Sequence, residues 1–237
     1  MHWISGAVSD QGRVRKANQD AYLDRPDLGL WAVADGMGGH TDGAIASGAL
    51  VEGLGSLARP RLLGSGARAM ERTLIAVNRR LLDRAEETAG GDLIGSTVVS
   101  LLALGDHCVL LWVGDSRIYR LRDGALQQLT TDHSQVQAMV DEGLLPPELA
   151  ERHPLSNVLL RAVGSDEPMP VDRRIERLRD GDRYLLCSDG LFRELDSDTI
   201  ATLAASPPAE AASALVQQAC DRGARDNVTV VAVQFME

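Results

Sequence analysis

Short apolar runs, bounded by turn residues, alternate along the chain with longer stretches in which apolar residues recur at helical spacing. Uninterrupted apolar runs are typical of strands that are covered on both faces. The pattern therefore predicts strands over residues 2–9, 30–34, 97–104, 108–113, 117–121, 183–188 and 227–235.

Apolar residues recur every three or four positions in three other segments, which predicts helices. The first two cover residues 41–59 and 67–88, and a stretch rich in glycine, proline and arginine separates them at 59–66. The third begins at Ser206-Pro207, and we expect Gly223 to cap its end. Strands in meander order, with paired helices after the first strands and before the last, predict a layered α+β sandwich.

Residues 132–164 interrupt this rhythm of strands. The segment combines a short helical stretch with prolines at positions 146, 147 and 154. Insertions of this kind are typical of surface flaps beside a functional site. We therefore expect a flap at 132–164 within a single domain that spans residues 1–237.

The composition narrows the classes of protein to which the chain can belong. Of its 237 residues 44% are hydrophobic, which is enough for a sizeable core. A formal charge of −10 argues against a nucleic-acid binder, which needs a basic surface. No membrane span and no signal peptide are visible. Each of the three cysteines lies in an apolar run, which predicts reduced thiols and a cytoplasmic location.

Aspartates stand at the ends of several predicted elements, and two of them follow apolar strands directly, as Asp35-Gly36 and Asp189-Gly190. A single aspartate at such a place can be a turn residue. Several carboxylates at one edge of a core would repel one another unless cations lie between them. Oxygen ligands favour Mg²⁺ or Mn²⁺ over zinc. The candidate ligands are Asp20, Asp35, Asp115, Asp189 and Asp226.

Arg15 lies five residues before Asp20 and could reach the same rim. A guanidinium group there could hold two oxygens of a phosphoryl group, although a surface arginine after a turn remains an alternative. The glycine-rich stretch 36–40 lacks the Gly-Lys-Ser/Thr of a nucleotide-binding loop, so tight turning beside Asp35 explains it better.

Cys187 and Arg193 have the spacing of phosphatases that use a cysteine nucleophile, with five residues between them. Such a loop needs a thiolate of low pKa and backbone N–H groups that bind a phosphate dianion. Asp189 lies inside this loop and would repel both anions, so the sequence favours a buried thiol at Cys187.

Six motifs, in order, resemble the metal-dependent serine/threonine protein phosphatases (the PPM, or type 2C, family) in their compact bacterial form. The resemblance extends over nearly the whole chain, from about residue 5 to residue 235. The motifs are Arg15-x-x-Asn18-Gln19-Asp20, Val33-Ala34-Asp35-Gly36-Met37-Gly38-Gly39-His40, Gly114-Asp115-Ser116-Arg117, Thr131-Asp132-His133-Ser134, Ser188-Asp189-Gly190-Leu191 and Arg225-Asp226-Asn227-Val228-Thr229.

The resemblance implies a four-layer αββα sandwich, in which two antiparallel sheets are flanked by helix pairs, and two Mn²⁺ or Mg²⁺ ions at the strand ends. It implies that Asp35 bridges the two ions and that Asp189 and Asp226 bind one of them. Asp20 and the carbonyl group of Gly36 would serve the other ion, partly through water.

The resemblance also implies a third, weaker ion at Asp115 and Asp189, and an Arg15 that orients the substrate phosphate. The chain departs from the family pattern at three places. Gln19 stands where eukaryotic members usually have Glu, as in bacterial relatives, so Asp20 would carry more of the ligation of its ion. Met37 stands where eukaryotic members have a histidine proposed as general acid, and His40 is the nearest histidine in sequence. Family members often have an acidic residue four positions after the aspartate that corresponds to Asp189. Arg193 stands at that position here, which puts the third ion in doubt.

The implied activity is hydrolysis of phosphoserine and phosphothreonine in proteins by a metal-activated water. Such an enzyme would reverse the action of a cognate bacterial Ser/Thr kinase, and we expect a monomer. The N-terminal motifs look similar to those of phosphatases that accompany type VI secretion kinases. A catalytically silent phosphoprotein-binding relative and a hydrolase of small phosphoesters are the alternatives.

Overall fold

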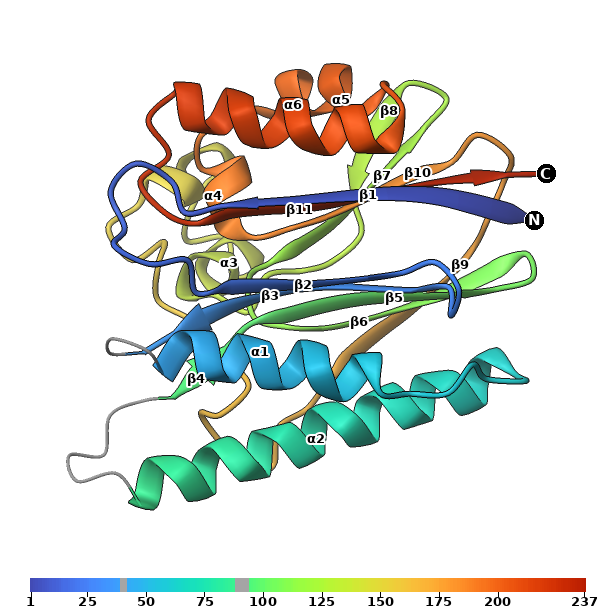
Figure 1. The fold of residues 1–237 in the computed structure, drawn as a ribbon. Coiled ribbons are helices and arrows are strands. Elements are labelled where there is room, and N and C mark those ends of the chain that lie inside the picture. The colour runs from blue at the N-terminus through green and yellow to red at the C-terminus, as the bar shows by residue number, and fades with distance from the viewer. Residues whose placement is uncertain (39–41, 88–93) are drawn as a thin grey trace.

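The computed structural model describes residues 1–38, 42–87 and 94–237. Its strands form two antiparallel sheets that face each other, and helices cover both outer faces (Figure 1). The predicted four-layer α+β sandwich is thus confirmed. In spatial order the first sheet contains β1 (His2–Asp10), β11 (Val228–Met236), β10 (Arg183–Cys187), β7 (Arg117–Arg122) and β8 (Ala125–Gln128). The second sheet contains β2 (Asp20–Arg25), β3 (Leu30–Met37), β5 (Val98–Leu104), β6 (His107–Val113) and β9 (Asp172–Arg177), and β4 (Gly95–Ser96) pairs with β3.

Helices α1 (Asp42–Gly55) and α2 (Leu63–Glu87) lie on the second sheet, whereas α5 (Ser197–Ala204) and α6 (Pro208–Asp221) lie on the first (Figure 1). The short helix α4 (Asp189–Phe192) follows β10. Segment 132–164, which we call the flap, contains α3 (Gln135–Asp141) and the 3₁₀ helix η1 (Pro147–Arg152). No helix in the part of the chain that the structure describes is both long and apolar enough to cross a membrane.

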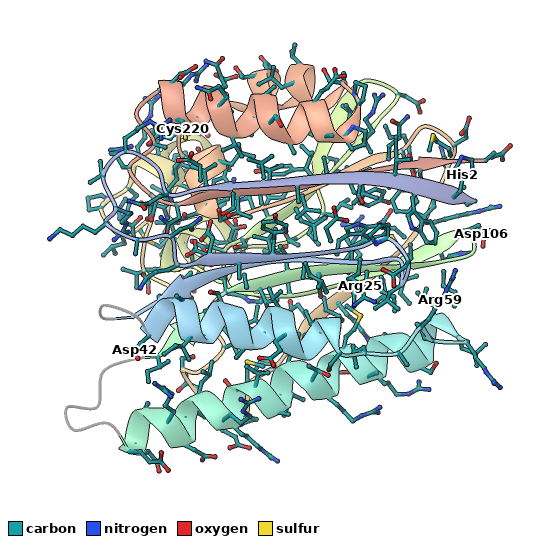
Figure 2. All side chains as sticks on the ribbon, viewed as in Figure 1. His2, Arg25, Asp42, Arg59, Asp106 and Cys220 are labelled. Atoms are coloured by element: carbon teal, nitrogen blue, oxygen red, sulfur yellow. The ribbon has the colours of Figure 1, made fainter. Side chains whose placement is uncertain are left out.

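Alternating side chains of β3 show why its sequence is apolar throughout. Leu30, Ala32 and Ala34 pack beneath the helices α1 and α2, whereas Trp31 and Val33 point between the two sheets. Successive strand residues face opposite sides, so a strand that is covered on both faces needs apolar residues at every position. Side chains fill the space between neighbouring layers (Figure 2).

The helix ends follow the local sequence. Pro208 opens α6, where its missing N–H costs nothing, and Gly223 follows the helix with a φ of +100°, a conformation that favours glycine. Asp196 caps α5 by accepting a hydrogen bond from the backbone N–H of Thr199, at 2.8 Å. The last helix thus begins at Pro208, one residue after the predicted Ser206-Pro207 start, and Gly223 follows its end as predicted.

Several predicted boundaries were wrong. The first helix ends at Gly55 rather than at 59, and α2 begins at Leu63, inside the predicted break. Positions 41 and 88, the outer limits of those two predictions, lie outside the described residues. Asp35 and Gly36 lie within β3 rather than after it, because β4 pairs with Gly36 and Met37 and prolongs the strand.

The predicted meander order holds only for parts of each sheet. Strands β3, β5 and β6 are consecutive neighbours, but β7 lies in the opposite sheet. Strand β11 lies between β1 and β10, so the first sheet joins segments from both ends of the sequence. Consequently the loop between β1 and β2, the helix α4 and the flap come together at one end of the sandwich (Figure 1).

Candidate active site

Asp20 and Asp35 face each other across the β2–β3 pair, where they are partners in the register. The hydroxyl groups of Ser188 and Thr229 donate hydrogen bonds to Oδ2 of Asp20, at 2.8 and 2.7 Å. The other oxygen of Asp20, Oδ1, is buried and has no hydrogen-bond partner among the residues that the structure describes. One carboxylate oxygen of Asp20 is thus held by the protein, and the other remains available to a ligand.

Asp189 and Asp226 come from the opposite sheet. Asp189 opens α4 directly after β10, and Asp226 precedes the neighbouring strand β11. A close backbone contact joins their motifs, since a Cβ atom on Gly190 would lie 2.1 Å from the carbonyl oxygen of Asn227. A side chain at position 190 would separate the two motifs, which explains the glycine after Asp189. Oδ1 of Asp189 is also buried, and no described residue forms a hydrogen bond with it.

Asn227 connects the loop between β1 and β2 to the start of β11. Its side-chain amide donates hydrogen bonds to the carbonyl groups of Gln11 and Ala17, at 2.9 and 3.0 Å. Its Oδ1 accepts a hydrogen bond from the backbone N–H of Gln19, at 2.8 Å. These contacts fix the loop that carries Arg15.

Arg15 forms a bidentate ion pair with Asp226. Its Nε lies 2.8 Å from Oδ1, and its Nη2 lies 2.6 Å from Oδ2. Of the Arg15 side chain, 56% remains exposed, so the guanidinium lies at the rim. The hydrogen bond to Asp226 raises the pKa of Arg15, and the charges of Asp35 and Asp189 add to the shift. The negative charges of three candidate ligands, Asp226, Asp35 and Asp189, therefore act on Arg15.

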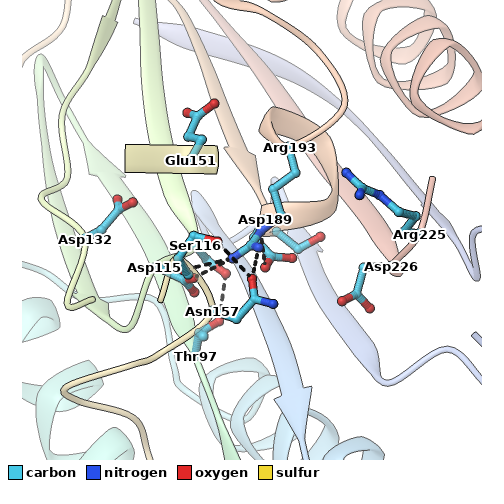
Figure 3. A network of polar contacts seen from close by, with 12 residues as sticks. Thr97, Asp115, Ser116, Asp132, Glu151, Asn157, Asp189, Arg193, Arg225 and Asp226 are labelled. Carbon is cyan, nitrogen blue, oxygen red and sulfur yellow. Dashed lines mark hydrogen bonds and ion pairs between the residues drawn. The ribbon is translucent and has the colours of Figure 1, made fainter. Parts of the chain in front are cut away.

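Asp115 lies in the turn between β6 and β7 and is 6% exposed. A hydrogen bond of 2.7 Å between the hydroxyl groups of Thr97 and Ser116 holds this turn (Figure 3). Arg193 approaches Asp115 and Asp189 with one guanidinium group. The structure thus places Asp115 beside Asp189, as the sequence predicts.

The aspartates raise one another's pKa values. Burial raises the pKa of Asp35 well above its ordinary value, and the charges of four other aspartates add to this shift: Asp20, Asp189, Asp115 and Asp226. Burial also raises the pKa of Asp20 to about 7, against the hydrogen bonds from Thr229 and Ser188. The pKa of Asp115 is raised to about 7 by burial and by the charge of Asp189. The site therefore concentrates negative charge that needs a counter-charge.

The unpartnered oxygens fit divalent cations. Buried carboxylate oxygens without donors are costly unless a cation satisfies them, and oxygen ligands suit Mg²⁺ and Mn²⁺. Within residues 1–38, 42–87 and 94–237, no three acidic, histidine or cysteine side chains already form a preassembled metal-binding group. Arg15 and Arg193 instead hold oxygens of Asp226 and Asp189. Arg15 engages both oxygens of Asp226, so binding of an ion there would require Asp226 to exchange arginine contacts for metal contacts, whereas Asp189 could use its unpartnered Oδ1.

Gly36 lies where three segments approach closely. Its N–H donates to the carbonyl group of Gln19 at 3.2 Å, and a Cβ atom at this position would lie 2.1 Å from the carbonyl oxygen of Gly43 in α1. The glycine therefore lets α1 begin directly beside Asp35. His40, the nearest histidine to Met37, lies outside the described residues.

Cys187 is buried in β10, and burial raises the pKa of its thiol to about 12. A thiol with this pKa is protonated at neutral pH and is a poor nucleophile. The site thus gives no support to a cysteine mechanism.

Sequence reasoning assigned no role to Ser188, Thr229 or Asn227, although all three lie within the motifs. It also assigned no role to Arg117 or to the Thr131–Ser134 motif. The Nη2 atom of Arg117 lies 2.8 Å from Oδ2 of Asp132, both side chains are largely buried, and the guanidinium packs over the ring of Phe192. These two motifs therefore hold the base of the flap against the first sheet.

A polar groove of about 790 Å³ adjoins the site at Arg15 and Asp226. Residues from the loop between β1 and β2, from the flap and from α4 line it, including Arg15, His153, Asn157, Arg193 and Asp226. An extended segment of another chain could reach Arg15 through this groove.

Comparisons with known proteins agree with this arrangement. The protein phosphatase 2C family profile matches residues 12–224. The chain is 37% identical over 232 residues to the serine/threonine protein phosphatase PstP of Mycobacterium tuberculosis, and this match covers 98% of the chain and 45% of PstP. The chain thus spans about half the length of that curated relative.

Solved structures show the same fold. The structure of PppA, described as a key regulatory component of the type VI secretion system in Pseudomonas aeruginosa, superposes with a TM-score of 0.91 at 38% identity, over 99% of this chain and 98% of PppA. A PstP catalytic domain in complex with two manganese ions gives a TM-score of 0.86 at 35% identity, over 99% of both chains. With its motifs, its fold and its facing carboxylates, the chain belongs to the protein phosphatase 2C family.

Proposed function

We propose that this protein hydrolyses phosphoserine and phosphothreonine in other proteins with the help of two Mn²⁺ or Mg²⁺ ions, and that residues 1–237 act as one catalytic domain. The observation that carries the proposal is the meeting of carboxylates from both sheets, with unpartnered oxygens on Asp20 and Asp189. The manganese ions in the PstP catalytic domain support the choice of metal.

In this proposal Asp35 would serve both ions, because it lies opposite Asp20 in the register of β2 and β3 and is close enough to the other candidate aspartates for their charges to raise its pKa. Asp189 and Asp226 hold one ion, and Asp20 and the carbonyl group of Gly36 serve the other. When bound, the ions would activate a water and stabilise negative charge on the phosphoryl oxygens. A catalytically silent relative is not favoured, because every one of these carboxylates is present.

Arg15 would then bind the phosphoryl group. Its guanidinium is exposed, lies at the mouth of the polar groove and holds a carboxylate in the two-point manner that also suits phosphate. The groove would place the chain that carries the phosphorylated residue. Ser188 and Thr229 would keep Asp20 oriented by donating to its Oδ2 atom.

Hydrolysis of phosphopeptides under a metal titration tests the proposal. Phosphothreonine and phosphoserine peptides should be hydrolysed with Mn²⁺ or Mg²⁺, and EDTA should remove the activity. A phosphotyrosine peptide and p-nitrophenyl phosphate serve as comparisons for the small-phosphoester alternative. Full turnover in EDTA, with metal content confirmed to be nil, would refute the proposal.

Metal affinity should fall as the pH falls, because protons and cations compete for the same oxygens. A raised pKa favours the protonated form, so Asp20, with a pKa of about 7, takes up a proton as the pH drops from 8 to 6. Below pH 7 we expect the apparent affinity for Mn²⁺ to weaken about tenfold per pH unit for each proton displaced. Calorimetric titrations in buffers of different ionisation enthalpy measure this proton release. An affinity that stays constant from pH 8 to 6 would contradict the assignment.

We further infer a cytoplasmic location, a monomeric state and a cognate Ser/Thr kinase. Three buried free cysteines support a reducing compartment. The similarity to PppA supports a link to type VI secretion, since that protein is described as a regulator of it. Phosphoproteomics of a deletion strain would test the link: sites on secretion-system components should gain phosphate.

A further inference from the structure

The turn residue Asp115 and the α4 residue Asp189 place two carboxylates next to each other in a largely buried setting. Asp115 is 6% exposed, and the side chain of Asp189 is 14% exposed. Two neighbouring carboxylates with little solvent need a positive group between them. The resemblance implies that a third divalent ion fills this role.

Arg193 already supplies a positive charge at this place. It lies one helical turn after Asp189, and its Nε is 2.7 Å from Oδ2 of Asp189. Its Nη2 is 3.7 Å from Oδ2 of Asp115. Figure 3 shows the guanidinium between the two carboxylates. A divalent ion that bound both aspartates would have to displace it, because two cations cannot share this space without repulsion.

The same guanidinium also binds the flap. Its Nη2 donates to the carbonyl group of Ser156 at 3.2 Å, and its Nη1 donates to Oδ1 of Asn157. The guanidinium offers its positive charge to the two carboxylates and its N–H donors to the flap acceptors, whereas a metal ion cannot donate hydrogen bonds. Arg193 thus joins a candidate metal ligand, Asp189, to the segment that lines the groove.

We propose that Arg193 replaces the third metal ion of this site and clamps the flap to it. This proposal rests on the proposed function and its two-ion site. Asp115 then serves as a counter-charge for Arg193 rather than as a metal ligand. The position of the flap is set by the chain itself and does not depend on the concentration of divalent ions.

The test counts bound Mn²⁺ and measures backbone hydrogen exchange on the same full-length proteins. Equilibrium dialysis with elemental analysis should find two ions per wild-type chain at saturation. Arg193→Ala should bind a third, weaker ion, and anomalous scattering should place it at Asp115 and Asp189. Three ions in the wild-type chain, with one between these carboxylates, would overturn the proposal.

Hydrogen exchange in the metal-free proteins tests the clamp separately. Arg193→Ala should speed exchange at residues 155–158 by about tenfold or more, because local opening no longer breaks the guanidinium contacts. Arg193→Lys keeps the charge that the buried aspartates need, so it should fold and bind two ions, but it lacks the fork and should also loosen the flap. Unchanged exchange in both variants would overturn the proposal.

Arg222→Ala is the matched control. Arg222 donates to the carbonyl group of Glu194 at 3.0 Å, close to α4, and its other contacts are with Asp196 and Thr199 rather than with the flap. Its removal should leave both the ion count and flap exchange unchanged. If no variant, including the wild type, bound any ion, the proposed function would fail, whereas the exchange data would still decide whether Arg193 holds the flap.

Discussion

Asp35→Asn should abolish turnover while leaving the fold intact. Asparagine is nearly the same size but cannot supply the negative charge that two cations would share at this position. Loss of one electrostatic partner of a transition state typically lowers kcat by about 10²–10³-fold, and the loss of a group that serves both ions should exceed this. Stopped assays on a phosphothreonine peptide at saturating Mn²⁺ would measure the effect.

The same substitution should stabilise the metal-free protein. Because the folded-state pKa of Asp35 is raised, its ionisation opposes folding, and this cost grows as the pH rises above the unfolded value of about 3.9. The thermal midpoint of the metal-free Asp35→Asn variant should therefore exceed that of the wild type at pH 7.5, and the gap should narrow toward pH 5. Metal should raise the midpoint of the wild type more than that of the variant.

Asp27→Asn provides the control for this experiment. Asp27 lies on the turn between β2 and β3, and its side chain is 60% exposed and paired with Arg25. Asp27→Asn should leave turnover unchanged. Any shift in its thermal midpoint should be the same with and without metal. Near-normal hydrolysis by Asp35→Asn would count decisively against the assignment of the site.

Arg15→Ala should lower kcat/KM for phosphopeptides by about 10²–10³-fold, the range typical for removal of one hydrogen-bond donor that stabilises a transition state. Metal binding should survive or tighten, because Asp226 loses its bidentate partner and gains free oxygens. The two readouts thus separate a phosphate-binding role from a purely structural one. Peptide kinetics and Mn²⁺ calorimetry on the same preparation would measure both.

Arg13→Ala is the matched control from the same loop. Arg13 pairs with Asp10, and its side chain is 47% exposed. Its removal should leave both readouts unchanged. If Arg15→Ala weakened Mn²⁺ binding as strongly as it slowed hydrolysis, Arg15 would act by bracing Asp226 rather than by holding phosphate.

The apolar pattern was sufficient to predict the central strands but not the edges of the second sheet. Strands β5, β6 and β10 are apolar and largely buried, so their sequence carries a strong signal. The edge strands β2 and β9 carry charged residues along much of their length, which is typical of edges protected against pairing with other chains. Their strand structure depends on a neighbour that local sequence does not reveal.

The structure brings the candidate carboxylates together at one edge of the sandwich, and their roles as metal ligands stay a prediction. The contacts that orient them could not be predicted in the same way. Thr229 and Asp20 are 209 positions apart, and Arg193 and Asn157 are 36 apart. Hydrogen bonds between such distant residues depend on the order of strands in the sheets and on the path of the flap. The predicted meander did not include the position of β11 between β1 and β10.

The position of β11 between β1 and β10 has a consequence for biosynthesis. Until residues 228–236 leave the ribosome, β1 has no neighbour in its sheet, and Thr229 cannot donate to Asp20. A nascent chain that already carries Arg15, Asp20 and Asp35 is therefore unable to complete its reaction centre. Such long-range closure is slow relative to local helix formation, so the candidate site should be among the last parts of the chain to form.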